Sequence, residues 1–141
     1  MGAAVGIAGT IIVTAASSAT AWGQSLKAQV VCAAQTESVY QAYKNAAFVP
    51  GFKFGSGDYQ SHFNTKLNKC LILINQIYQY NGETMTTAQL SDAFERRVLA
   101  NYSLNLKNNI LDCKLTPTLD KTANCSSRVE FDAFVAKYME Q

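Results

Sequence analysis

Apolar side chains at helical spacing mark the segment that follows the uncharged start of the chain. Between Ser25 and about Ala47 there is no proline or glycine. The apolar positions recur three and four residues apart, as they do on one face of an α-helix; they are Ala28, Val31, Cys32, Val39, Ala42, Tyr43 and Ala46. We therefore expect an N-terminal helix that buries Cys32.

The middle of the chain has the patterns of loops and strands. Pro50-Gly51 and the glycine-rich cluster at 55–58 predict a loop. An extended stretch at 59–64 and a turn near 66–69 are expected next. The run Cys70–Ile74 is apolar and β-branched, which is typical of a short buried strand.

The dipeptide Asn81-Gly82 is a strong signal for a tight β-hairpin. The segment that follows it, 88–103, is ambiguous, because its large apolar residues fit both a helical and an alternating period. A hairpin turn needs a returning strand, and this favours the strand interpretation. A further strand is expected near Asn109–Leu115.

The C-terminal segment predicts an amphipathic helix. Ser127 and Glu130 have the spacing of a capping box, and apolar residues follow at helical intervals from Phe131 to Met139. With 141 residues the chain is one domain. The predicted fold class is α+β: an N-terminal helix, an antiparallel sheet of about three to four strands and a C-terminal helix, with both helices on one face of the sheet.

The first charged side chain is Lys27, and the residues before it are consistent with an export signal. An apolar run over 3–13 is followed by small polar residues and by the A-x-A pattern at 19–21. We expect residues 1–21 to be a signal peptide and 22–141 to be the exported domain, periplasmic or secreted. The alternative is that 1–21 stay as a membrane anchor.

Four cysteines in a small exported domain predict two disulfide bonds. The scattered spacing, without any C-x-x-C, argues against a zinc site, and we expect no bound metal. Of the three possible pairings, the order of the predicted elements favours Cys32–Cys70 and Cys113–Cys125.

Charge and missing motifs exclude several functions. The 12 Lys and Arg residues against 10 Asp and Glu give a formal charge of +2, far from the basic excess of a nucleic-acid-binding protein. The sequence contains no phosphate-binding, dinucleotide, zinc-protease or haem-attachment motif. We therefore expect no cofactor and no nucleic-acid partner.

Three motifs together resemble a group of small exported bacterial proteins of unknown function. They are the segment from His62 to Cys70, with the form H-[FY]-[NS]-x-K-x-N-x-C, the D-x-[FY]-E segment at 92–95, and the E-F-D segment at 130–132 of the last helix. The resemblance implies an exported compartment and a strand at 92–102, and it implies no activity.

Several polar residues are candidates for a site. His62 is the single histidine and, with Asp92 or Glu95, could act in general acid–base catalysis. Structural roles explain these residues as well. The candidate binding residues are Asn64, Lys66, Tyr78, Tyr80 and Arg96, because amides, cations and tyrosines suit a peptide or glycan.

Two functions from different classes remain open. The first, which we favour, is a non-catalytic binding or accessory module for an envelope protein, peptide or glycan. The second is a small hydrolase or transferase that uses His62 with Asp92 or Glu95.

Overall fold

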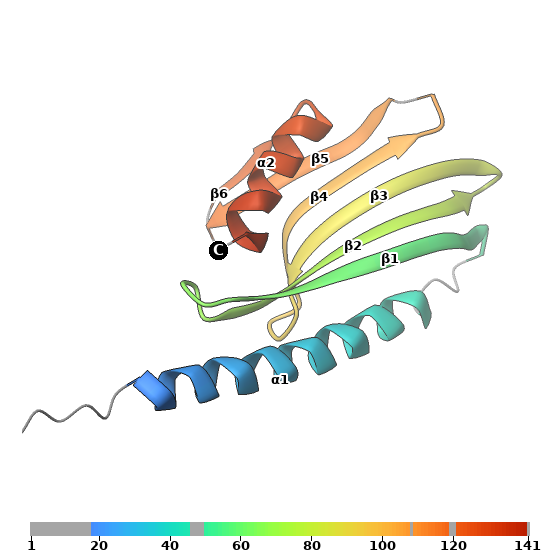
Figure 1. Cartoon of the computed structure of the whole chain (residues 1–141). Coiled ribbons are helices and arrows are strands. Elements are labelled where there is room, and N and C mark those ends of the chain that lie inside the picture. Colours follow the sequence, from blue (N-terminus) through green and yellow to red (C-terminus); the bar gives the residue numbers. More distant parts are fainter. Residues whose placement is uncertain (1–17, 46–49, 108, 119–120, 141) are drawn as a thin grey trace, which may run out of the picture.

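The computed structural model describes residues 18–45, 50–107, 109–118 and 121–140, with side chains from Ser25 onward. The described chain consists of two helices and six strands (Figure 1). In chain order these elements are α1 (Ser18–Asn45), β1 (Phe52–Asn64), β2 (Lys69–Tyr80), β3 (Glu83–Asp92), β4 (Arg97–Asn105), β5 (Ile110–Thr118), β6 (Lys121–Asn124) and α2 (Arg128–Met139).

The strands form one antiparallel meander in the order β1-β2-β3-β4-β5-β6. The predicted sheet of three to four strands is therefore wrong. Two strands were missed for different reasons. One was merged with its neighbour into a single expected strand, and the other lies in a segment that was expected to be a loop. Segment 88–103 contains the end of β3 and most of β4, and β6 lies in the polar segment between Cys113 and Cys125.

The glycine-rich cluster at 55–58 is not a loop but part of β1, and close backbone approach explains why. A Cβ atom at Gly55 would lie 2.9 Å from the carbonyl oxygen of Ile77, and one at Gly57 would lie 2.8 Å from that of Asn75. Only glycine fits at such distances, so these residues let β1 pair closely with β2 at a register shift next to Phe54.

The strand interpretation of 88–103 holds, but a turn interrupts it. One carboxylate oxygen of Asp92 accepts hydrogen bonds from the backbone N–H of Phe94 at 3.0 Å and of Glu95 at 3.1 Å. Arg96 adopts a positive φ of 54°. This Asx-type turn reverses the chain between β3 and β4, and it leaves Phe94 exposed rather than on a buried strand face.

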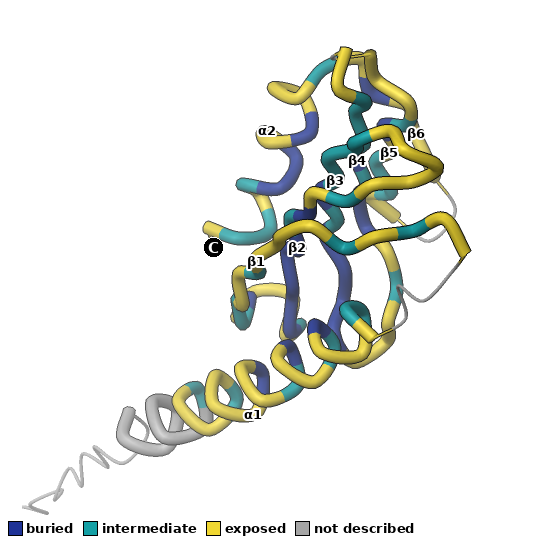
Figure 2. The backbone as a smooth tube through the Cα atoms, turned by 90° about the vertical axis from the view of Figure 1, so that its right-hand side faces the viewer, coloured by how far each residue is buried: buried dark blue, intermediate teal, exposed yellow. Residues whose placement is uncertain are grey.

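The two helices cover opposite faces of the sheet, which corrects the expectation that both lie on one face. Leu71 and Leu73 belong to the apolar cluster under α2, whereas Cys70, Ile72 and Ile74 belong to the cluster under α1. Successive side chains of a strand point to opposite faces. We call the two surfaces the α2 face and the α1 face. Figure 2 shows the buried residues along β2 and on the inner side of α2.

Both predicted disulfide bonds are present. Cys32 of α1 is bonded to Cys70 of β2, with 5.3 Å between their Cα atoms. Cys113 of β5 is bonded to Cys125, which directly follows β6, with a Cα separation of 5.1 Å. The first bond therefore fixes α1 to the sheet, and the second fixes the entry to α2.

The capping box at the start of α2 is present in a modified form. The Ser127 hydroxyl accepts a hydrogen bond from the backbone N–H of Glu130, as the pattern predicts. The Glu130 carboxylate accepts its reciprocal bond from the N–H of Ser126 at 2.8 Å, one residue earlier than expected. Phe131, Phe134 and Val135 then bury the helix against the sheet.

At the N-terminus, α1 begins at Ser18, so residues 18–21 of the predicted signal peptide form its first turn. The rest of that segment lies outside the described residues. No helix in the described part of the chain is both long enough and apolar enough to cross a membrane.

Candidate functional site

The predicted binding residues lie at two opposite ends of the sheet. Asn64, Lys66 and Arg96 are at the turns β1–β2 and β3–β4, whereas Tyr78 and Tyr80 are near the far end of β2. Strand β2 has 12 residues, so at about 3.3 Å per residue it separates these ends by roughly 36 Å. The five residues therefore do not form one site.

Asn64 has a structural position. Its side chain is fully buried, and its amide nitrogen donates a hydrogen bond of 2.8 Å to the carbonyl oxygen of Tyr138 at the end of α2. Its amide oxygen accepts a bond from the backbone N–H of Leu67. Asn64 thus joins the β1–β2 turn to α2, while Lys66 is exposed in that turn.

The two tyrosines belong to an aromatic group on the α1 face. The ring of Tyr78 stacks on Phe52 with 4.7 Å between the ring centres. Burial raises the pKa of Tyr78 above its ordinary value. Tyr80 is exposed opposite Glu83 beside the β2–β3 turn.

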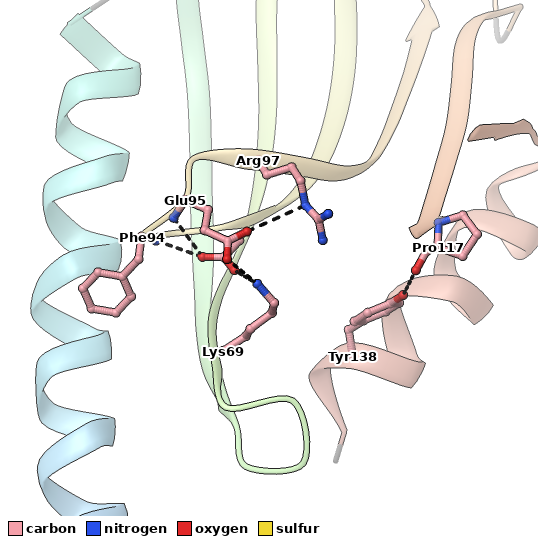
Figure 3. Close-up of polar contacts among 7 residues, drawn as sticks. Lys69, Phe94, Glu95, Arg97, Pro117 and Tyr138 are labelled. Carbon is pink, nitrogen blue, oxygen red and sulfur yellow. Dashed lines mark hydrogen bonds and ion pairs between the residues drawn. The ribbon is translucent and has the colours of Figure 1, made fainter. Parts of the chain in front are cut away.

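The candidate catalytic residues lie at the end of the sheet that holds the β3–β4 turn. The register places His62 opposite Leu71 and Leu71 opposite Asp92, so one strand separates the histidine from the aspartate. Asp92 and Glu95 both bind the Lys69 ammonium, at 2.6 and 2.8 Å (Figure 3).

The charges around Lys69 shift the pKa values of this group. Burial works to raise the pKa of Asp92, but the hydrogen bonds from Lys69 and from the backbone N–H groups of Glu95 and Phe94 outweigh it and lower that pKa. The hydrogen bonds to Asp92 and Glu95 in turn raise the pKa of Lys69. The lowered pKa keeps Asp92 ionised, which suits a structural ion pair better than a proton-transfer role. No group of three potential metal ligands occurs among the described residues.

A different cleft combines volume with two oppositely charged side chains. It lies on the α2 face beyond the N-terminal end of α2 and has a volume of about 350 Å³. Its lining comes from three strands and one helix: Ser56, Gly57, Asp58, Asn75, Gln76, Ile77, Thr86 and Arg128. This volume is at the lower end of that of typical small-ligand pockets, about 300–1,000 Å³. We call it the Arg128 cleft.

Three contacts hold Arg128 in place. Its Nε donates to a carboxylate oxygen of Asp132 at 2.8 Å, one helical turn away. Its guanidinium lies over the rings of Tyr102 and Phe131, with centroid distances of 5.6 and 5.5 Å. Among the described residues its two terminal nitrogens make no hydrogen bond, so they can serve a ligand.

On the sheet side, Asp58 supplies the opposite charge. It accepts a hydrogen bond of 3.0 Å from the side-chain amide of Asn75, the residue directly opposite on β2. No cationic group of the described residues lies within 4.0 Å of its carboxylate. The Arg128 cleft therefore presents two charged groups to the same space: the Asp58 carboxylate, which has no ion pair among the described residues, and the Arg128 guanidinium, whose Nε is bound to Asp132 while its terminal nitrogens make no hydrogen bond.

Sequence reasoning missed this cleft, although one signal for part of it was available. The Asn81-Gly82 turn pairs Tyr80 with Glu83, and counting back from it pairs Ile77 with Thr86. These two cleft residues could therefore have been placed side by side. Arg128 could not, because its position depends on how α2 packs on the sheet.

Comparison with known proteins yields no relative. No protein-family model matches the chain, and neither a curated protein nor a solved structure matches it. The residues of the site itself are therefore the basis for a functional assignment.

Proposed function

We propose that this chain is an exported, disulfide-stabilised binding domain without catalysis of its own, and that it holds a component of the cell envelope in the Arg128 cleft. The observation that carries the proposal is the juxtaposition of Arg128 and Asp58 in one cleft. Arg128 is oriented by its ion pair with Asp132 but keeps its terminal nitrogens free of hydrogen bonds, and Asp58 is oriented by Asn75 and has no ion pair among the described residues.

The chemistry of the cleft favours binding over catalysis. An arginine stays protonated at all physiological pH values, so Arg128 can orient an anion but cannot exchange a proton. The carboxylates named for catalysis, Asp92 and Glu95, are bound to Lys69 on another part of the sheet. No specific observation supports a hydrolase or transferase.

Calorimetric titration of the purified chain with both disulfides formed tests this function. The titrants are a panel of blocked peptides and chitotetraose. We expect saturable binding of at least one of them, weakened by Arg128→Gln and unchanged by the control Arg96→Gln, which removes the same charge from an exposed turn at the other end of the sheet. Absence of binding throughout the panel, or equal loss in both variants, would contradict the proposal.

Export is tested separately. If residues 1–21 are removed, the intact mass of the chain recovered from the exported fraction corresponds to a start at Trp22. A helix that continues from Ser18 tolerates this cut, because only its first turn is lost. Recovery of the uncut chain in the membrane fraction would support the anchor instead.

A further inference from the structure

A row of mostly aliphatic side chains crosses the α2 face, and its first two members, Ile77 and Thr86, line the Arg128 cleft. Ile77, Thr86, Leu104 and Ile110 lie directly opposite one another on β2, β3, β4 and β5, so they form one row across the α2 face. The side chains at the two ends of the row, Ile77 and Ile110, are 46% and 39% exposed. Helix α2 does not cover these ends.

A second row, beside the first, carries the charges. Asp58, Asn75, Ala88 and Tyr102 are opposite one another on β1 to β4, and Arg128 lies over the Tyr102 ring. With about 4.8 Å between neighbouring strands, Asp58 and Tyr102 are roughly 14 Å apart along the sheet. The anion and the cation thus lie near the two ends of one row, and the aliphatic row runs beside that row.

From these two rows we infer that the ligand of the Arg128 cleft is an extended peptide segment in which an aliphatic side chain lies between an acidic and a basic one. This inference rests on the proposed binding function and specifies its ligand. In an extended peptide alternate side chains point the same way, and four residues span about 13 Å. Residues i and i+4 therefore match the separation of Arg128 and Asp58, and the side chain of residue i+2 can lean onto Ile77 and Thr86 in the neighbouring row, which line the same cleft.

The aliphatic row argues for a peptide rather than a glycan. Sugar rings pack their C–H faces on exposed aromatic rings, but the row consists of aliphatic and hydroxyl side chains. The aromatic ring beneath it, Tyr102, is only 3% exposed and is covered by Arg128. A buried aliphatic contact between two charge-assisted hydrogen bonds is a combination that peptides supply.

The test is a cycle in which the protein and the peptide are changed together. The probe is the blocked pentapeptide Ac-Glu-Ser-Ile-Ser-Lys-NH2, compared with versions that have glutamine for glutamate or serine for isoleucine. On the unmodified chain we expect each replacement to weaken binding about three- to tenfold, as the loss of one charge-assisted or apolar contact implies. On Arg128→Gln, the glutamate replacement should have an effect of less than about 1.5-fold, because its partner is already gone.

Two further measurements sharpen the result. The replacement of lysine by glutamine in the peptide should likewise no longer weaken binding to the Asp58→Asn variant. The Arg96→Gln variant should give the same ratios of peptide affinities as the unmodified chain. Equal affinity of the glutamate and glutamine peptides for the unmodified chain would overturn the inference.

The same titrations separate the inference from the proposed function. Binding of chitotetraose that depends on Arg128, without binding of the peptides, would overturn the peptide ligand and keep the binding function. Failure of all probes would overturn both.

Discussion

The two faces of the sheet differ in how far the helix on each face covers its apolar side chains. On the α1 face the buried apolar cluster lies where α1 covers it, and the neighbouring positions of β3 to β5 are polar: Gln89, Asn101 and Lys114 in one row, Thr87, Ser103 and Asp112 in the next. On the α2 face the apolar side chains extend beyond α2, to the exposed Ile77 and Ile110.

This difference indicates which open surface is used. The polar groups of the α1 face partly bind one another; Asn101, for example, donates to Asp112 at 2.6 Å. On the α2 face exposed aliphatic side chains lie beside Asp58, which has no ion pair among the described residues, and beside the free terminal nitrogens of Arg128. Exposed apolar surface rimmed by polar groups is typical of interaction sites. The Arg128 cleft is therefore the stronger candidate for binding.

The largest predicted effect on stability comes from the two disulfide bonds, one of which fixes α1 to the sheet while the other fixes the entry to α2. Replacing Cys32 and Cys70 together by alanine should lower the free energy of unfolding by about 4 kcal/mol, and replacing Cys113 and Cys125 by about 3 kcal/mol, on the chain-entropy model. The order follows from the sequence separations of 38 and 12 residues. Urea unfolding of both variants under oxidising conditions measures it, and a reversed order would contradict the assignment of the larger constraint to α1.

Two neighbouring residues on β3 point to opposite faces of the sheet, so their substitution by alanine compares the two faces. Leu90 is fully buried in the cluster under α2, whereas Gln89 points to the open α1 face. We expect Leu90→Ala to cost about 2–5 kcal/mol and Gln89→Ala no more than about 0.5 kcal/mol. Similar losses in the two variants, measured by urea unfolding, would show that the faces do not differ in this way.

The ion pair at the end of the sheet predicts a smaller, pH-dependent effect. The pKa of Asp92 is lower in the folded state than its ordinary value, so its contribution is complete above about pH 4 and is lost as the pH falls through the folded pKa. Asp92→Asn should cost about 1–3 kcal/mol at pH 7.

The matched control for this effect is Asp132→Asn, in an exposed pair on α2. The cost of Asp92→Asn should shrink toward pH 2, and at pH 7 it should exceed the cost of the control, which removes an exposed pair of about 0.2–1 kcal/mol. A constant cost across the pH range would contradict the role of the Lys69 ion pair.

The smallest predicted effect on the free energy of unfolding comes from a substitution in the Arg128 cleft. Because Ile77 is half exposed, Ile77→Thr keeps the β-branched shape and should change the free energy of unfolding by no more than about 0.5 kcal/mol. A ligand that covers the aliphatic row should nevertheless bind this variant several-fold more weakly. Unchanged affinity would remove Ile77 from the site.

Local signals in the sequence predicted part of this structure. The cysteine pairing, the cap at Ser127 and the strand character of 88–103 follow from spacing over short distances, and the structure confirms them. The strand count was wrong because the prediction merged the end of β3 with β4 at 88–103 and placed a loop where β6 lies. The expected start of β1 was wrong because the glycines at 55 and 57 are typical of loops, and their use for close strand pairing depends on β2.

The site was harder to predict than the fold elements. Residues chosen for their chemistry, such as Asn64 and Asp92, proved to hold turns and helix ends together. The cleft brings together Asp58 and Arg128, 70 positions apart in the chain, through the register of the sheet and the packing of α2. Such long-range placement leaves no pattern in a single sequence.

A map of backbone amide shifts during titration with Ac-Glu-Ser-Ile-Ser-Lys-NH2 tests the central claim most directly. Binding in the Arg128 cleft predicts saturable shifts at Asp58, Ile77, Thr86 and Val129, with Gln89 and Asn101 on the other face unchanged. Shifts concentrated on Gln89 and Asn101, or no saturable shift anywhere, would contradict it.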